Sequence, residues 1–174
     1  CVAVQAASTS AGANVVEWAV NLSDTSQQWK LTQVEDTGCV MDTTKTYQFR
    51  NANSNLYLEV ANGKAEDGSN VQQWGANEPA AHNTWRVLSD GDGYYTLYPQ
   101  IGDKVSYLLD VAGNAAANGT NLGIWSATDA DAQRFKFYEA ADGVYYLLTK
   151  TSGDQSCVAV QAASTSAGAN VVEW

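Results

Sequence analysis

Two carboxylates stand at matching places in the 174-residue sequence and could in principle do acid–base chemistry. Glu59 lies in a Leu-Glu-Val triplet and Asp110 in a Leu-Asp-Val triplet, and a tryptophan follows each of them fifteen positions later. Paired carboxylates cleave glycosidic bonds when both flank one scissile bond. Because Glu59 and Asp110 recur at equivalent places of separate repeats, we expect them in separate pockets, where they cannot share a substrate.

Other catalytic and metal-binding patterns are missing from the sequence. It has no G-x-S-x-G motif, no glycine-rich phosphate loop, no C-x-x-C spacing, and His82 is its only histidine. The Asp- and Gly-rich stretch 89–93 lacks the bidentate glutamate of a calcium loop and is typical of a turn. Cys39 could form a disulfide with Cys1 or Cys157, or the thiols could stay free. The sequence predicts no enzyme, no cofactor and no metal site.

The residues that could do chemistry belong to a skeleton that occurs three times in the chain. In each copy an asparagine follows the middle residue of an aliphatic triplet by eleven positions, a tryptophan follows four positions later, and a second aromatic residue follows ten or eleven positions after that. Such internal periodicity indicates a repeat architecture. The successive members are Glu59, Asn70, Trp74 and Trp85; Asp110, Asn121, Trp125 and Phe135; Ala3, Asn14, Trp18 and Trp29.

Each repeat of about 50 residues has the pattern of short strands joined by tight turns. Aromatic and aliphatic residues alternate around turns rich in Gly, Asn, Asp and Ser, and no segment has the pattern of a long amphipathic helix. Three blades are too few for a β-propeller, which needs about four to eight. We therefore predict an all-β protein, a β-trefoil of three pseudo-symmetric four-stranded repeats around one core.

The order of the repeats is circularly shifted, because residues 1–18 are identical to residues 157–174. A single trefoil has one place for the duplicated strands, so we interpret the chain as a window of a tandem array or as a permuted trefoil with an overlap. A chain that bridges two trefoils would self-associate through exchanged ends. The predicted divisions are the end of the third repeat (1–38), a linker (39–46), the first repeat (47–93), the second repeat (94–143) and the start of the third repeat (144–174).

The closing motif of each repeat carries a family resemblance. Residues 27–29 (QQW), 83–85 (NTW) and 133–135 (QRF) resemble the Q-x-W triplets of ricin-type β-trefoil lectins, a group also classed as family 13 carbohydrate-binding modules. Asn83 replaces the glutamine in one triplet and Phe135 the tryptophan in another. The resemblance extends over essentially the whole chain and implies non-catalytic carbohydrate binding.

In that family each repeat can hold a shallow sugar pocket, with a carboxylate for the hydroxyl groups, an aromatic face for the ring, and amides. The matching positions in the third repeat include Ala3 and its duplicate Ala159, which cannot accept a hydrogen bond, so we expect that pocket to be lost. The resemblance assigns the following carbohydrate-binding residues: Asp110, Asn121, Trp125 and Gln133 in the second repeat, and Glu59, Gln72, Trp74, His82 and Asn83 in the first.

The charge and composition of the chain exclude several classes of binding partner. Nine basic and nineteen acidic residues give a net charge of −10, which repels nucleic acids and anionic lipids. No apolar run approaches the length of about 20 residues that spans a bilayer. We expect a glycan or polysaccharide as the partner and a secreted or cell-surface location. The alternative is a structural or adhesive tandem-repeat trefoil with vestigial pockets, and the sequence does not identify the sugar.

Overall fold

The computed structural model describes residues 2–4, 15–17, 41–76 and 80–174. The chain divides into two compact units, Cys1–Asp36 and Thr37–Trp174. In the first unit, strands β1 (Val2–Val4) and β2 (Val15–Glu17) pair antiparallel, with Ala3 opposite Val16. The remaining parts of that unit, which belong to the predicted end of the third repeat, lie outside the described residues.

The described part of the second unit consists of short strands and 3₁₀ turns, and it contains no helix long and apolar enough to span a membrane. The strands and turns are β3 (Thr46–Tyr47), β4 (Tyr57–Val60), η3 (Ala61–Gly63), β5 (Val71–Trp74), η4 (Ala80–Asn83), β6 (Trp85–Gly91), β7 (Tyr94–Pro99), β8 (Tyr107–Val111), η5 (Ala112–Asn114), β9 (Leu122–Ser126), η6 (Asp131–Gln133), β10 (Phe135–Ala141), β11 (Val144–Thr149), η7 (Lys150–Ser152), β12 (Val158–Val160), η8 (Gln161–Ala163) and β13 (Val171–Glu173).

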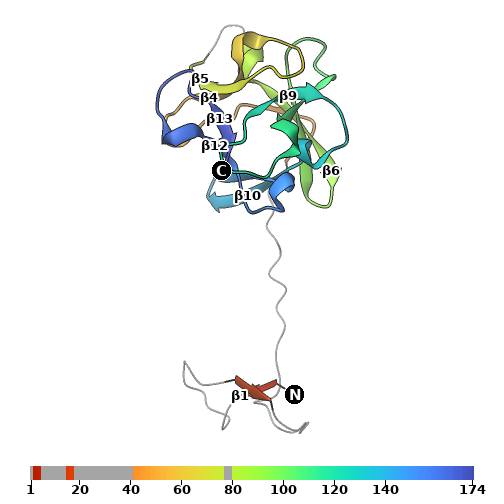
Figure 1. Ribbon diagram of the computed structural model, residues 1–174, viewed down its shortest axis with the longest axis vertical. Helices are drawn as coiled ribbons and strands as arrows, with labels where there is room; N and C mark the ends of the chain where they lie inside the picture. The colour runs from red at the N-terminus through yellow and green to blue at the C-terminus, as the bar shows by residue number, and fades with distance from the viewer. Residues whose placement is uncertain (1, 5–14, 18–40, 77–79) are drawn as a thin grey trace. The chain divides into compact units, whose positions relative to one another are not determined.

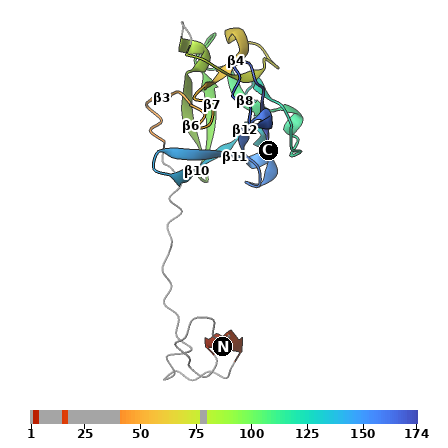
Figure 2. The same ribbon diagram turned by 90° about the vertical axis from the view of Figure 1, so that its left-hand side faces the viewer.

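The longest strands form one antiparallel sheet in the order β11-β10-β7-β6-β3. The β6–β7 ribbon turns at Gly91, Asp92 and Gly93, all of which have positive φ, a conformation that glycine and aspartate adopt most readily. Figure 2 shows β6 and β7 side by side, with β10 and β11 below them. The inward side chains of this sheet and of the hairpins form the core, in which Trp85 and Phe135, two of the closing aromatic residues, are fully buried. Trp29, the third of them, lies outside the described residues.

Three two-stranded hairpins repeat one register. Glu59 pairs with Gln72 in β4–β5, Asp110 with Gly123 in β8–β9, and Ala159 with Val172 in β12–β13. Strands β5, β9 and β13 contact one another in all three pairs, and Figure 1 shows them grouped together. The hairpins are therefore three copies of one structural unit.

Backbone hydrogen bonds join these hairpins in a closed cycle. In each, a glycine N–H of one repeat donates to a strand carbonyl of the next, and that strand residue donates back to the loop. Since the bonds use only main-chain atoms, the arrangement tolerates different side chains. The glycine bonds are Gly68 N to Ile124 O (2.9 Å), Gly119 N to Glu173 O (2.7 Å) and Gly168 N to Gln73 O (2.9 Å).

The asparagines of the repeat skeleton meet at the centre of this cycle. The amide of Asn70 donates to Asn170 Oδ1 at 2.9 Å, and the amide of Asn170 donates to Asn121 Oδ1 at 2.7 Å. Asn121 donates in turn to the carbonyl of Leu122 at 3.1 Å. These side chains satisfy one another where the three repeats converge, which explains why the skeleton repeats an asparagine at this place.

Cys157 is half-buried and forms no disulfide with the described residues, and burial raises the pKa of its thiol. Cys39, its predicted partner, and Cys1, the other candidate partner of Cys39, lie outside them.

Candidate functional site

A cavity of about 360 Å³ opens beside the second hairpin and brings together Asp110, Asn121 and Trp125. Three of the four residues predicted for the second repeat therefore border one space. The remaining lining residues come from the hairpin itself, from η5 and η6, and from the loop that precedes β5: Gly68, Ala112, Gly113, Asn114, Gly123, Ile124, Thr128, Ala130 and Ala132.

Asp110 supplies the carboxylate of this cavity from the middle of β8. Burial raises the pKa of its carboxyl above the ordinary aspartate value, the hydrogen bond from Gln133 opposes that rise, and the charge of Asp67 adds to it. Its cross-strand partner is Gly123, where a β-carbon would lie only 3.0 Å from the carbonyl oxygen of Ser69. Glycine therefore allows the neighbouring loop to approach closely and leaves space beside the carboxylate.

Gln133 is fully buried, and its amide is used within the protein. Its Nε2 donates to Asp110 Oδ2 and to the Ser126 carbonyl, both at 3.0 Å, and its Oε1 accepts from Thr128 N at 2.9 Å. The closing glutamine thus orients the Asp110 carboxylate and holds the loop between β9 and η6.

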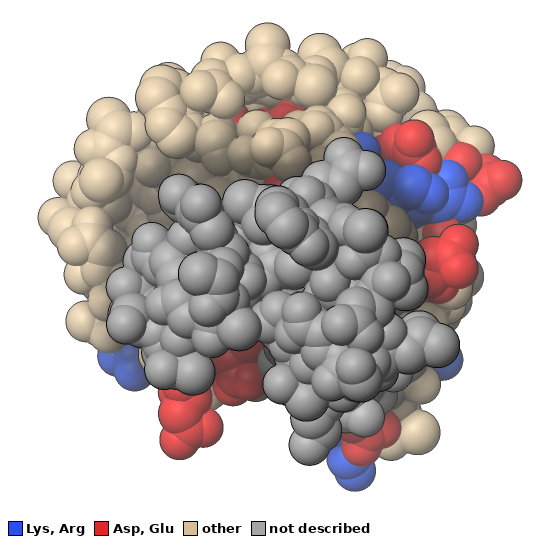
Figure 3. Space-filling view, turned by 90° about the horizontal axis from the view of Figure 1, so that it is seen from below, with Lys and Arg blue, Asp and Glu red and all other residues tan. Residues whose placement is uncertain are grey.

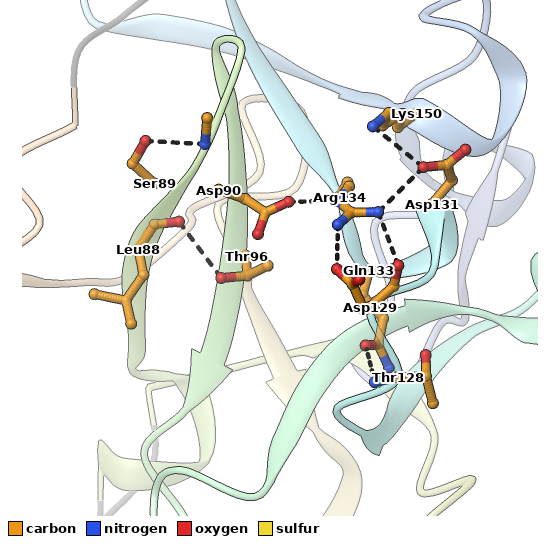
Figure 4. Close-up of polar contacts among 11 residues, drawn as sticks. Leu88, Ser89, Asp90, Thr96, Thr128, Asp129, Asp131, Gln133, Arg134 and Lys150 are labelled. Carbon is orange, nitrogen blue, oxygen red and sulfur yellow. Dashed lines mark hydrogen bonds and ion pairs between the residues drawn. The ribbon is translucent and has the colours of Figure 1, made fainter.

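A surface ion-pair network fixes η6, which carries Gln133. The Arg134 guanidinium pairs with Asp90, Asp129 and Asp131, and Lys150 pairs with Asp131 at 3.2 Å. Figure 4 shows Arg134 between Asp90 on one side and Asp129 and Asp131 on the other. The network connects η6 to the β6–β7 ribbon and to η7. The loop between β9 and η6, which borders the cavity, is therefore held from two sides.

Trp125 presents an aromatic face beside the cavity. Its side chain is 45% exposed, and a β-carbon at Gly68 would lie 3.7 Å from its Cζ3. Asp67 Oδ1 accepts hydrogen bonds from the N–H and the hydroxyl of Ser126, at 2.7 and 2.8 Å, which fastens the loop of the first repeat next to Trp125. The cavity is therefore built from two repeats.

Several lining residues were not identified from the sequence. Asn114 lies at the rim with φ +52°, and its Oδ1 accepts from Thr151 at 3.3 Å. Gly68 belongs to another repeat and reaches the cavity only because the hairpins close into a cycle. Of these residues, only Asn114 had a signal within its own repeat, as a polar residue that follows a glycine at a loop position.

The predicted residues of the first repeat are arranged differently. Glu59 is only 2% exposed, and Gln72 Nε2 donates to its Oε1 at 3.1 Å. Burial raises the pKa of Glu59, while the Gln72 hydrogen bond and the charge of His82 lower it in part. Trp74 is 40% exposed and lies against Gly168 of the third repeat, as Trp125 lies against Gly68. The carboxylate and the tryptophan are thus positioned as in the second repeat, but the carboxylate is covered.

His82 and Asn83 stand at the end of η4, and residues 77–79 before them lie outside the described residues. The His82 ring lies directly over Gly63, where a β-carbon would be 2.2 Å from Nε2. Asn83 is fully buried. Its Oδ1 accepts from Gln48 at 2.6 Å, and its Nδ2 has no hydrogen-bond partner among the described residues. Asn83 is one methylene shorter than Gln133 and does not donate to the carboxylate of its repeat.

The third hairpin has the same backbone register as the other two but lacks the carboxylate of their pockets. Ala159 stands at the carboxylate position and Val172 opposite it. Trp174 is 62% exposed. Ala159 offers no acceptor for a hydroxyl group, in agreement with the expected loss of this pocket. The corresponding side chains of the duplicate, Ala3 and Val16, lie outside the described residues.

Basic and acidic side chains are mixed on the face of the described residues shown in Figure 3. On the face shown in Figure 3, the basic side chains of the described residues lie in small groups, several of them beside acidic ones. Among the described residues, no group of three or more His, Cys, Asp or Glu could hold a metal ion.

Comparison with known proteins identifies the family. The family described as "Ricin-type beta-trefoil lectin domain-like" matches residues 1–74, 40–105 and 102–174. A search of curated protein sequences finds no match.

Solved structures agree with this assignment. A designed three-fold symmetric protein, ThreeFoil, is 32% identical with a TM-score of 0.67 over 74% of this chain and 88% of its own. An exo-β-1,3-galactanase from Clostridium thermocellum is 24% identical, with a TM-score of 0.68 over 75% of this chain and 27% of its own. A ricin B-like lectin from Macrolepiota procera, solved with lactose, is 16% identical, with a TM-score of 0.57 over 75% and 85%. The predicted β-trefoil is confirmed, and the chain belongs to the ricin-type β-trefoil lectin family.

Proposed function

We propose that the protein is a non-catalytic carbohydrate-binding module whose main pocket is the cavity of the second repeat. The observation that carries the proposal is the convergence of the Asp110 carboxylate and the exposed Trp125 ring on one cavity. A carboxylate accepts hydrogen bonds from neighbouring sugar hydroxyls, and an indole face packs against the apolar side of a pyranose. Gln133 supports this function by orienting Asp110.

Relatives in the family support the ligand class. The Macrolepiota procera lectin was solved with lactose and an earthworm R-type lectin with GalNAc. For this chain we extend the inference only to a glycan or polysaccharide. A secreted or cell-surface location, where such ligands occur, is part of the proposal.

The absence of catalysis is also part of the proposal. Glu59 and Asp110 stand on different hairpins, each next to its own tryptophan, so they do not flank a common bond. We expect no release of reducing sugar from polysaccharides. Release by the purified protein that Asp110→Asn or Glu59→Gln abolishes would contradict this expectation.

The binding experiment follows the two indole N–H signals of Trp125 and Trp174 by NMR during titration with galactose, xylose, arabinose and lactose. We expect at least one sugar to shift the Trp125 signal saturably at millimolar concentration and to leave Trp174 unchanged. No response of Trp125 to these sugars, together with a blank glycan array, would overturn the proposal. Nanomolar binding of a monosaccharide would contradict the shallow, weak pocket that we infer.

A second candidate, a self-associating structural trefoil, is favoured by one observation on the five-stranded sheet. Strands β11 and β3 stand at its ends. Tyr145 of β11 is 40% exposed, although Tyr95 at the same place of β7 is 7% exposed. Tyr138, Val144 and Tyr146 are also exposed beside it. Such an apolar strand edge is a site for pairing with further chain.

For this candidate we keep the hypothesis that residues 1–38 complete one trefoil while residues 46–174 build most of the next, although the side chains of residues 1–38 lie outside the described residues. Sedimentation over a hundredfold concentration range tests it. A mass that rises with concentration supports the exchange, and a monomer throughout contradicts it. A self-associating protein with no glycan response would favour the structural role over sugar binding.

A further inference from the structure

The first and second repeats differ in which of two facing rim positions carries the larger side chain. One position lies in the turn after the carboxylate strand, at Gly63 in η3 and Asn114 in η5. The other lies directly before the closing amide, at His82 in η4 and Ala132 in η6. The first repeat combines glycine with histidine, and the second combines asparagine with alanine.

In the first repeat the histidine ring occupies the space between the two turns. A β-carbon at Gly63 would lie 2.2, 2.3 and 2.8 Å from Nε2, Cδ2 and Cε1 of His82, so the imidazole rests on the glycine backbone. Gly63 also has φ +61°, which glycine adopts without strain. Any other residue at position 63 would collide with the ring unless the ring moved.

In the second repeat the same space is open. Ala132 contributes only a methyl group, and Asn114, whose Oδ1 accepts from Thr151 Oγ1, lies at the border of the cavity with it. The exposure of the two carboxylates differs in the same way: Glu59 is 2% exposed, whereas Asp110 is half-buried. The charge of His82 also acts on Glu59, which places the imidazole near that carboxylate.

We propose that His82 is a specificity-determining residue: its ring occupies the first sugar pocket and excludes the pyranose that the open second pocket accepts. The inference rests on the proposed function of the second pocket and adds that the described unit binds one sugar, although two of its hairpins carry a carboxylate and a tryptophan. It replaces the expectation that His82 touches the sugar.

Reciprocal exchange of the two residues tests the proposal. In His82→Ala we expect the sugar that shifts the Trp125 indole signal to shift the Trp74 signal as well, and the stoichiometry to rise from about one to about two. In the double variant Ala132→His/Asn114→Gly, which recreates the pairing of His82 with Gly63, we expect the Trp125 response to weaken at least about tenfold, because the ring would fill the second cavity. His82→Phe is the control of similar bulk, and Trp74 should stay silent in it.

Three outcomes would overturn the proposal. Trp74 could respond in the wild-type protein as strongly as Trp125, His82→Ala could leave Trp74 silent, or Ala132→His/Asn114→Gly could bind as well as the wild type. A crystal structure of His82→Ala gives a readout without sugar, and we expect a new cavity between Ala61–Gly63 and η4. A site that stays filled refutes the inference about His82. The new cavity in a protein whose Trp125 responds to no sugar would refute the proposed function alone.

Discussion

The second and third hairpins have the same backbone and different chemistry. Both make the same cross-strand register, and both join the cycle of backbone hydrogen bonds through one strand residue and one loop glycine. Only the second opens onto the cavity described above. Among the positions that line this cavity, Asp110, Asn114 and Gly123 of the second hairpin correspond to Ala159, Ala163 and Val172 of the third.

This difference shows that the symmetry of the fold and the function of each repeat are carried by separate sets of atoms. The N–H of Gly119 donates to the carbonyl of Glu173 just as that of Gly68 donates to the carbonyl of Ile124, although glutamate and isoleucine share no chemistry. Main-chain bonds keep the third hairpin in place after its pocket residues have changed. A repeat fold can thus retain a unit that no longer binds ligand.

Of the changes proposed here, removal of the Asp110 charge should reduce sugar affinity the most. We expect Asp110→Asn to weaken sugar binding by about 1.5–3 kcal/mol, about ten- to a hundredfold, because hydrogen bonds to a charged acceptor are lost. The asparagine oxygen can still accept from Gln133, so the loop should stay in place. Isothermal titration calorimetry measures the change.

The matched control for this prediction is Glu173→Gln, in the third hairpin. Glu173 is fully buried, accepts from Thr149 at 2.6 Å, and does not line the cavity of the second repeat. Its substitution should leave the affinity unchanged. Equal losses in both variants would show that carboxylates act here through stability rather than through contact with the sugar.

Acidification should remove the same acceptor without a mutation. Burial raises the pKa of Asp110 in the folded protein, so its carboxylate takes up a proton at a higher pH than an ordinary aspartate does. Affinity should therefore be full at neutral pH and fall as the pH decreases through that raised pKa. Calorimetric titrations between neutral pH and pH 4 would show it, and a pH-independent affinity would exclude the Asp110 carboxylate as the acceptor.

The sequence predicted the part of this comparison that depends on spacing. The offset of fifteen positions from each carboxylate to its tryptophan covers one hairpin, so Asp110 and Trp125 had to lie on paired strands, and Ala159 marked the third hairpin as different. Register alone decides these positions, because side chains alternate along a strand.

Other features depend on tertiary packing and could not be read from spacing. The direction of the Gln133 amide follows from its burial among Asp110, Ser126 and Thr128. Gly68 reaches the second cavity from another repeat, through contacts that exist only after the cycle closes. The position of the His82 ring depends on the missing side chain of a residue nineteen positions earlier.

Truncation of Trp125 in the second hairpin and of Trp174 in the third should change sugar affinity differently, by a smaller amount than the loss of the Asp110 charge. We expect Trp125→Ala to weaken binding by about 1 kcal/mol through loss of the stacking surface, and to leave the fold intact because the ring is 45% exposed. Trp174→Ala should not change binding. Fluorescence and NMR titrations measure both. Unfolding of Trp125→Ala would show that this ring is part of the core, contrary to its exposure.

The smallest predicted effect is on the free energy of unfolding, and it arises from the backbone of the turn that follows the carboxylate strand in each repeat. Ala162 and Ala163 have φ of +54° and +49°, a region in which a β-carbon is strained, and glycine stands at one of the two matching places in each of the other repeats, as Gly63 and Gly113. We expect Ala163→Gly to raise the free energy of unfolding by about 0.5–1 kcal/mol, since relief of strain exceeds the added entropy of the unfolded chain. Ala167→Gly, at an exposed position of the same loop without positive φ, is the control and should lower that free energy. Urea denaturation followed by tryptophan fluorescence distinguishes the two, and sugar affinity should stay the same in both. If both glycines destabilise the protein equally, the left-handed turn of the third hairpin is not strained, and the backbone of this hairpin has adapted to alanine along with its side chains.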